Sequence, residues 1–278
     1  MKTYNDVEIP SFIYGTAWKK DATTKLVQQA VETGFRAIDT ANQLRHYDEA
    51  RVGEALDGFW KKGVKRESLF LQTKYTSAGG QDHRTPYDRS ADPATQVRQS
   101  FESSLQHLHT DYLDSYVLHG PTFRQGLTPE DWEVWGAIEE LYAAKKTRII
   151  GVSNFSAEQL ALLSFRAKTK PMVVQNRCFA VLGWDHQVRE ICSDQGIVYE
   201  GFSLLTANQE FFGAPKIHAA AARLRTGIAQ VIFKFSMQIG MVPLTGTTDP
   251  DHMREDLDVD NLGPLTDEEM ESILTIGI

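Results

Sequence analysis

Four side chains with acid–base chemistry fall at or just beyond the ends of three consecutive predicted strands. They are Asp39, Tyr47, Lys74 and His119. A lone buried charge is costly, so such residues are expected to compensate one another. We predict that Lys74 lies between Asp39 and Tyr47, where its ammonium lowers the pKa of the phenol. His119 would hold a carbonyl oxygen on which negative charge develops. The group suits reduction of a carbonyl, with Tyr47 as the proton donor.

Each of these residues also has a structural interpretation. Asp39 could cap a turn, Lys74 could extend outward to solvent, Tyr47 could pack at the start of a helix, and His119 could be a structural histidine. Four coincidences at adjacent strand ends are less expected than one site.

The elements that would position these residues alternate regularly between strand and helix patterns. Eight such strands separated by helices predict parallel strands with helical crossovers, and hence a single (β/α)8 TIM barrel over residues 1–278. An open doubly wound sheet is the alternative, but the Gly-x-Gly-x-x-Gly turn after its first strand is missing. The predicted strands are Ser11–Ala17, Arg36–Ala41, Leu69–Tyr75, Tyr112–His119, Arg148–Asn154, Met172–Arg177, Ile197–Ser203 and Met241–Thr245.

Helix boundaries have their own signals. Ser156 followed by Gln159 predicts a capped helix start. A glycine closes several helical patterns just before a strand, where a left-handed residue is expected; these are Gly34, Gly63, Gly196 and Gly240. The segment Thr76–Ala91 has no such pattern and is predicted to be a long, structureless loop.

Composition favours small-molecule chemistry. The net charge is −8 and no stripe of Lys and Arg occurs, which argues against a nucleic-acid surface. No apolar run approaches the ~20 residues of a membrane span, and no signal peptide is evident. Cys178 and Cys192 are too few and too far apart for a zinc cluster. We expect a cytoplasmic protein without a metal, a monomer or weak homo-oligomer.

Several motifs, in order along the chain, resemble the aldo-keto reductase family. They are Gly34-Phe35-Arg36-Ala37-Ile38-Asp39-Thr40-Ala41, Asp48-Glu49-Ala50-Arg51-Val52-Gly53-Glu54-Ala55-Leu56, Thr73-Lys74, Tyr112-Leu113-Asp114 leading to His119, and Gly151-Val152-Ser153-Asn154-Phe155. The resemblance covers nearly the whole chain. It implies reduction of aldehydes or ketones with a nicotinamide cofactor, and the family's tetrad roles for Asp39, Tyr47, Lys74 and His119.

The resemblance also implies a cofactor cradle without a Rossmann fingerprint. Ser153, Asn154 and Gln175 match the family's carboxamide ligands, although Ser153 and Asn154 could merely cap a helix and Gln175 fill the barrel. Phe202 stands where the family usually stacks a tyrosine on the nicotinamide. The remaining predicted cofactor contacts, beside Asp39, are Ser203 and Leu205 in the pyrophosphate loop and Thr247, His252, Glu255 and Asp256 after the last strand.

The chain departs from the family pattern at three places. Leu44 occupies the usual tyrosine position, and Tyr47 is the nearest tyrosine. The family's phosphate-selective Lys and Arg are not evident after the last strand, so we expect NADPH with NADH as the alternative. The chain ends soon after a helical pattern at 266–274, where many relatives continue into a loop over the pocket. Trp18, Trp184 and the segment 76–91 are candidate replacement walls, although each tryptophan could equally be a packing residue.

Other functions remain open from sequence. The fold also serves as a cofactor-sensing subunit with little turnover. A metal-dependent hydrolase is a weaker alternative, since His119 has no neighbouring metal-ligand motif. Among other tyrosines, Tyr75 should point to the opposite face of its strand from Lys74 and pack against a helix. Tyr87 in the long loop is the alternative proton donor.

Overall fold

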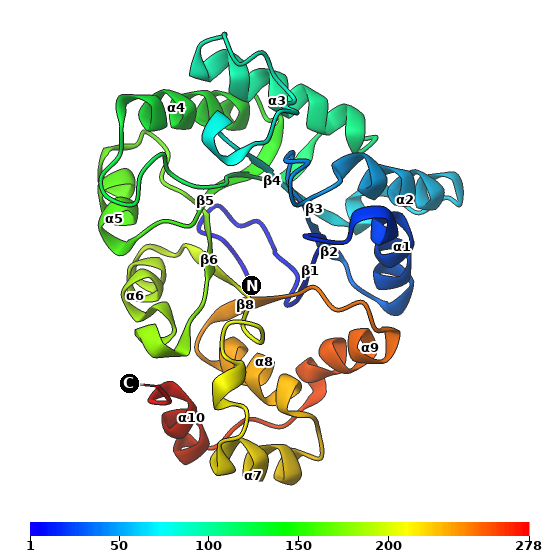
Figure 1. The fold of residues 1–278 in the computed structure, drawn as a ribbon, viewed down its shortest axis with the longest axis vertical. Coiled ribbons are helices and arrows are strands. Elements are labelled where there is room, and N and C mark those ends of the chain that lie inside the picture. Colours follow the sequence, from blue (N-terminus) through cyan, green and yellow to red (C-terminus); the bar gives the residue numbers. More distant parts are fainter. Residues whose placement is uncertain (278) are drawn as a thin grey trace.

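Eight parallel strands close into a barrel in the computed structural model, which describes residues 1–277 (Figure 1). Each strand pairs with its neighbour along the chain, and β8 closes the ring by pairing with β1. The TIM-barrel prediction is therefore confirmed. The strands are β1 Ile13–Gly15, β2 Ala37–Asp39, β3 Phe70–Tyr75, β4 Leu113–Leu118, β5 Thr147–Ser153, β6 Val173–Arg177, β7 Val198–Phe202 and β8 Met241–Thr245.

Helices surround the barrel and bury its outer face (Figure 1). Most of them connect one strand to the next along the chain, as the alternating pattern predicts. α7 and α10 are additional and pack against each other outside the ring. The helices are α1 Thr23–Thr33, α2 Glu49–Lys61, α3 Pro93–His107, α4 Pro129–Ala143, α5 Ala157–Arg166, α6 His186–Gln195, α7 Pro215–Leu224, α8 Ile228–Gln238, α9 Pro250–Asp258 and α10 Asp267–Leu274.

The predicted helix signals are found where expected. Ser156 and Gln159 form a reciprocal capping box at the start of α5. All four predicted glycines have positive φ at helix ends, for example +67° at Gly196. The segment 76–91 is less irregular than predicted, because Ala78–Gly80 form a 3-10 turn within it.

An N-terminal hairpin lies across one end of the barrel, at the centre of the ring in Figure 1. Lys2 and Glu8 form an antiparallel bridge. The Tyr4 hydroxyl donates to the carbonyl of Lys170 at 2.5 Å, just before β6 begins. The hairpin thus covers the N-terminal ends of the strands, and the loops after the strands build the opposite face, where TIM barrels place their sites.

A buried ion pair stabilises the structure away from that face. The Asp114 carboxylate, at the start of β4, lies 2.8 Å from Arg66 and 2.8 Å from Arg148. Within residues 1–277, no helix is both long enough and apolar enough to cross a membrane.

Candidate active site

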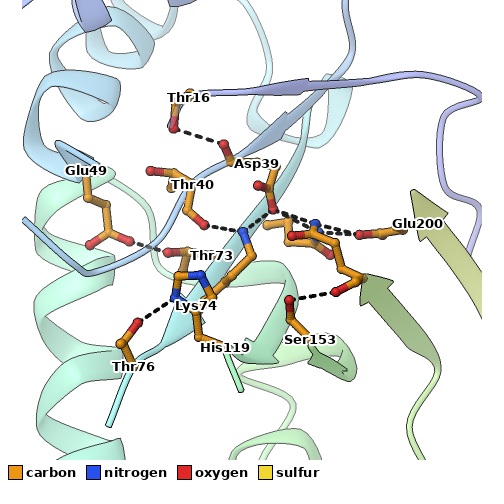
Figure 2. A network of polar contacts seen from close by, with 12 residues as sticks. Thr16, Asp39, Thr40, Glu49, Thr73, Lys74, Thr76, His119, Ser153 and Glu200 are labelled. Carbon is orange, nitrogen blue, oxygen red and sulfur yellow. Dashed lines mark hydrogen bonds and ion pairs between the residues drawn. The ribbon is translucent and has the colours of Figure 1, made fainter. Parts of the chain in front are cut away.

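Lys74 and Asp39 form a buried ion pair at the ends of β3 and β2. The Lys74 Nζ lies 2.5 Å from Asp39 Oδ1 and donates to the carbonyl of Thr40 at 2.8 Å (Figure 2). The lysine side chain is fully buried. Because a buried ammonium needs compensation, the carboxylate and carbonyl together keep this charge inside the barrel.

Tyr47 lies near Lys74 and His119 despite its shifted position in the sequence. Its ring centroid lies 5.8 Å from that of His119, and Lys74 Nζ lies 5.4 Å from the tyrosine ring centroid. Residues 43–47 form a turn, in which the Tyr47 N–H donates to the carbonyl of Gln43. The phenol hydroxyl has no hydrogen-bond partner among residues 1–277 and faces the cavity described below.

The electrostatics of Tyr47 differ from the prediction. Burial, and secondly the charge of Asp39, raise the pKa of the phenol. The prediction that Lys74 lowers this pKa is therefore wrong for this structure. The reason is that the ammonium is engaged with Asp39 and the Thr40 carbonyl. Tyr47 is a neutral phenol at neutral pH, which is still the form that donates a proton.

His119 is held by its neighbour strand. Its Nδ1 lies 2.7 Å from the Thr76 hydroxyl (Figure 2), and its backbone N–H donates to the carbonyl of Tyr75. Burial, and secondly the charge of Lys74, lower the pKa of the imidazole to about 3. The ring is therefore neutral at physiological pH and carries one N–H.

Two amides connect this cluster to a second carboxylate that the sequence analysis did not identify. The side-chain amide nitrogens of Gln72 and Gln175 each lie 3.0 Å from Asp39 Oδ1. The same nitrogens lie 2.6 and 2.9 Å from Glu200 Oε2. Strand alternation was an available signal, since Gln72 is two residues from Lys74 and Glu200 two residues from Phe202.

A cavity of about 770 Å³ opens above these residues. It is lined by most of the predicted site residues: Asp39, Tyr47, His119, Ser153, Gln175, Phe202, Ser203, Leu205, Thr247, His252, Glu255 and Asp256. Lys74 lies behind Asp39 and does not line it. Asn154 does not line it either, because its amide turns to the carbonyl of His119 at 2.8 Å. Its predicted role as a carboxamide ligand stays a prediction.

The backbone is strained where two strands end at this cavity. Asn154 after β5 and Ser203 after β7 have φ of +59° and +57°. Non-glycine residues in the left-handed region are uncommon and often lie at functional sites. The hydroxyl of Ser153, the last residue of β5, donates to the carbonyl of Gln175 at 2.6 Å.

The far end of the cavity lies at β8 and α9. Asp249 caps α9, its carboxylate accepting from the backbone N–H of Asp251 and His252. Arg254 pairs with Asp251 and does not line the cavity. Lys19 lines it, from the loop after β1, and contacts the carbonyl of Gly246. Lys19 was not identified from sequence, because the search for a cation considered only the segment after the last strand.

Only one of the three predicted replacement walls lines the cavity. Trp18 does so, with its ring 4.2 Å from that of His46 between centroids. Trp184 is buried instead and donates to the carbonyl of Ile273 at 3.0 Å. The segment 76–91 packs behind the loop that carries Tyr47, where the Gln81 amide donates to the carbonyl of Asn42 at 2.8 Å. The predictions for Trp184 and for this segment as pocket walls are therefore wrong.

The two other tyrosines that the sequence analysis considered, Tyr75 and Tyr87, do not line the cavity. Tyr75 is buried against α3, with its hydroxyl 3.3 Å from the Gln96 amide oxygen, as strand alternation predicts. Tyr87 stacks beside Tyr75, and its hydroxyl donates to the carbonyl of Thr76 at 2.7 Å.

The cavity joins the reaction-centre residues to the segment after β8. The lining runs from Tyr47 and His119 at the barrel centre to Thr247 and His252 at α9. The lining includes the hydroxyl-bearing Ser153, the amide-bearing Gln175, the Phe202 ring and Lys19. Within residues 1–277, no group of three or more His, Cys, Asp and Glu is arranged to hold a metal ion.

Comparisons with known proteins point to one family. Residues 12–208 match the model of the Aldo/keto reductase family. The chain is 30% identical to glyoxal reductase of Bacillus subtilis over 98% of its length and 91% of that protein. It is 31% identical to deoxymugineic acid synthase 1 of Hordeum vulgare, covering 93% of this chain and 83% of that one. MGS-M4, an aldo-keto reductase from a deep-sea metagenome, superposes with a TM-score of 0.84 at 26% identity, covering 100% and 96% of the two chains.

Proposed function

Because the chain belongs to the aldo-keto reductase family and is thus an oxidoreductase, we propose that it reduces aldehydes or ketones to alcohols with NADPH. The observation that carries this proposal is the Tyr47 hydroxyl, which has no hydrogen-bond partner among residues 1–277. Tyr47 and His119 line one cavity with Asp39, and the Lys74 Nζ that pairs with Asp39 lies 5.4 Å from the centroid of the tyrosine ring. No residue of this group is a nucleophile activated by a base, which is what hydrolysis would need.

The bound nicotinamide would supply hydride to the carbonyl carbon. Ser153 and Gln175 would hold its carboxamide, and Phe202 would pack on its ring. As negative charge grows on the carbonyl oxygen, the N–H of neutral His119 donates a hydrogen bond to it. Tyr47 donates its phenolic proton to that oxygen, and Lys74 offsets the negative charge of Asp39 beside the phenol. Asp39 keeps Lys74 charged and in place.

This proposal has a direct test. The purified protein is mixed with NADPH and a nitrobenzaldehyde or phenanthrenequinone, and oxidation of the cofactor is followed by absorbance. Many turnovers per protein molecule are expected. Slow oxidation that stops at one equivalent would instead indicate a cofactor-sensing subunit.

The preference for NADPH over NADH is expected to be modest. A 2′-phosphate near α9 would meet the carboxylates of Asp249 and Asp251, and Lys19 is the nearest cation that lines the cavity among the described residues. We expect dissociation constants that differ by about 10-fold, measured by quenching of tryptophan fluorescence with each cofactor. A preference of many thousand-fold would mean that a cation outside the cavity lining reaches the phosphate.

Thr76 is expected to set the tautomer of His119. Its buried hydroxyl has no other hydrogen-bond partner among residues 1–277, so it is free to donate to Nδ1. The imidazole proton would then sit on Nε2. Thr76→Val keeps the shape and removes the hydroxyl, and should lower kcat/KM by about 10-fold, the worth of one hydrogen bond. Thr76→Ser, the matched control, should retain most activity. Equal loss in both variants would assign the effect to packing.

A further inference from the structure

Glu200 is a fully buried carboxylate that the chemistry described above does not use. It lies on β7, next to Gln175 in the register of β6 and β7. Its Oε2 accepts hydrogen bonds from the amides of both Gln72 and Gln175 (Figure 2), while its Oε1 is buried without a partner in the described part of the chain. A buried charge with one unpaired oxygen is costly, so its presence calls for a function.

The hydrogen bonds of Glu200 leave its two glutamine partners a single orientation. Each amide nitrogen carries two hydrogens, and each is directed to Asp39 Oδ1 on one side and Glu200 Oε2 on the other. A flipped amide would place its carbonyl oxygen against two carboxylates. The carbonyl of Gln175 is therefore turned away from both acids, and Gln175 lines the cavity.

We propose that Glu200 is a positioning residue for the cofactor: it locks the Gln175 amide so that its carbonyl oxygen accepts from the nicotinamide carboxamide. This inference rests on the proposed function. Without Glu200, one N–H of Gln175 would lose its acceptor, and the amide would be free to rotate. Asp39 alone does not prevent this, because it satisfies only one of the two hydrogens.

The charge on Glu200 gives the proposal a readout that simple packing would not produce. Burial, and to a smaller degree the charge of Asp39, raise the pKa of this carboxyl to about 7, against the opposing effects of the two amides and Lys74. Asp39 on β2 and Lys74 on β3 are the charged groups that act on it; its β6 and β8 partners, Gln175 and Val242, are neutral. Protonation below this pKa weakens the acceptor, so cofactor affinity should fall as pH falls through about 7.

The experiment compares Glu200→Leu and Glu200→Gln with wild type. NADPH is titrated from pH 5.5 to 8.5, and the dissociation constant is taken from tryptophan fluorescence. Leucine removes the acceptor and should weaken binding by about 10-fold at pH 8. Glutamine retains a neutral acceptor, so binding should stay within about threefold of wild type. Its affinity should also lose the part of the pH dependence that wild type shows near 7.

Glu49→Gln is the matched control, because Glu49 is an equally buried carboxyl that contacts Thr73 and His107 and does not line the cavity. It should leave NADPH binding unchanged. Unaltered affinity in Glu200→Leu would overturn the inference. Should that variant fail to fold, the same pH dependence in wild type and Glu200→Gln would overturn it. Failure of wild type to bind either NADPH or NADH would instead refute the proposed function.

Discussion

Replacing Lys74 with methionine should lower kcat for carbonyl reduction by about 10³-fold. The ammonium is the positive charge that balances Asp39 inside the barrel. The Gln72 amide connects Asp39 to a second buried carboxyl, Glu200. Without it, the carboxylate of Asp39 stands uncompensated beside the oxygen on which negative charge develops. Proton transfer from Tyr47 becomes harder for the same reason, since a nearby negative charge raises the pKa of the phenol further. The measurement is steady-state kinetics with a saturating aromatic aldehyde.

Lys74→Met also breaks a buried ion pair, which typically costs about 3–5 kcal/mol of stability. Arg66→Met is the control, because it removes one partner of the buried Asp114 pair at the other end of the barrel. Both variants should unfold at lower temperature, but only Lys74→Met should lose catalysis. Wild-type turnover in Lys74→Met would show that Lys74 does not contribute to the reaction.

The parts of the site that sequence predicts are those set by strand ends. Asp39, Lys74 and His119 each stand where a parallel strand finishes, and closure of the barrel brings such ends to one face. The alternation of strand and helix patterns was sufficient to predict that closure. The start of α5 followed equally well from Ser156 and Gln159, since a capping box is a purely local signal.

The parts that were missed depend on contacts between distant segments. Glu200 lies 128 residues from Gln72 along the chain, and only barrel closure shows that one amide joins it to Asp39. Trp184 was expected in a pocket wall. Its indole instead bonds to Ile273 in α10, a contact between distant segments that no local pattern predicts. The pKa of Tyr47 was predicted to be lowered, but it is raised. The sequence does not show that Lys74 pairs with Asp39 and the Thr40 carbonyl rather than with the phenol.

Tyr47→Phe is expected to lower kcat by about 10³-fold while leaving NADPH binding unchanged. The substitution keeps the ring near His119 and removes only the hydroxyl, which faces the cavity without a partner among the described residues. Since burial raises the pKa of this phenol, kcat should not fall with rising pH until well above neutral. The measurements are kcat as a function of pH and fluorescence titration of NADPH with both proteins.

Tyr87→Phe is the matched variant, because it removes a tyrosine hydroxyl from the loop that was the alternative source of the proton. That hydroxyl already donates to the carbonyl of Thr76 at 2.7 Å, and it does not line the cavity. Its loss should cost about 1 kcal/mol of stability and change kcat by less than about threefold. A severe loss of kcat in Tyr87→Phe, with near-normal turnover in Tyr47→Phe, would show that the 76–91 loop rearranges to supply the acid. The shifted spacing from Leu44 to Tyr47 would then reflect a tyrosine that does not take part in the reaction.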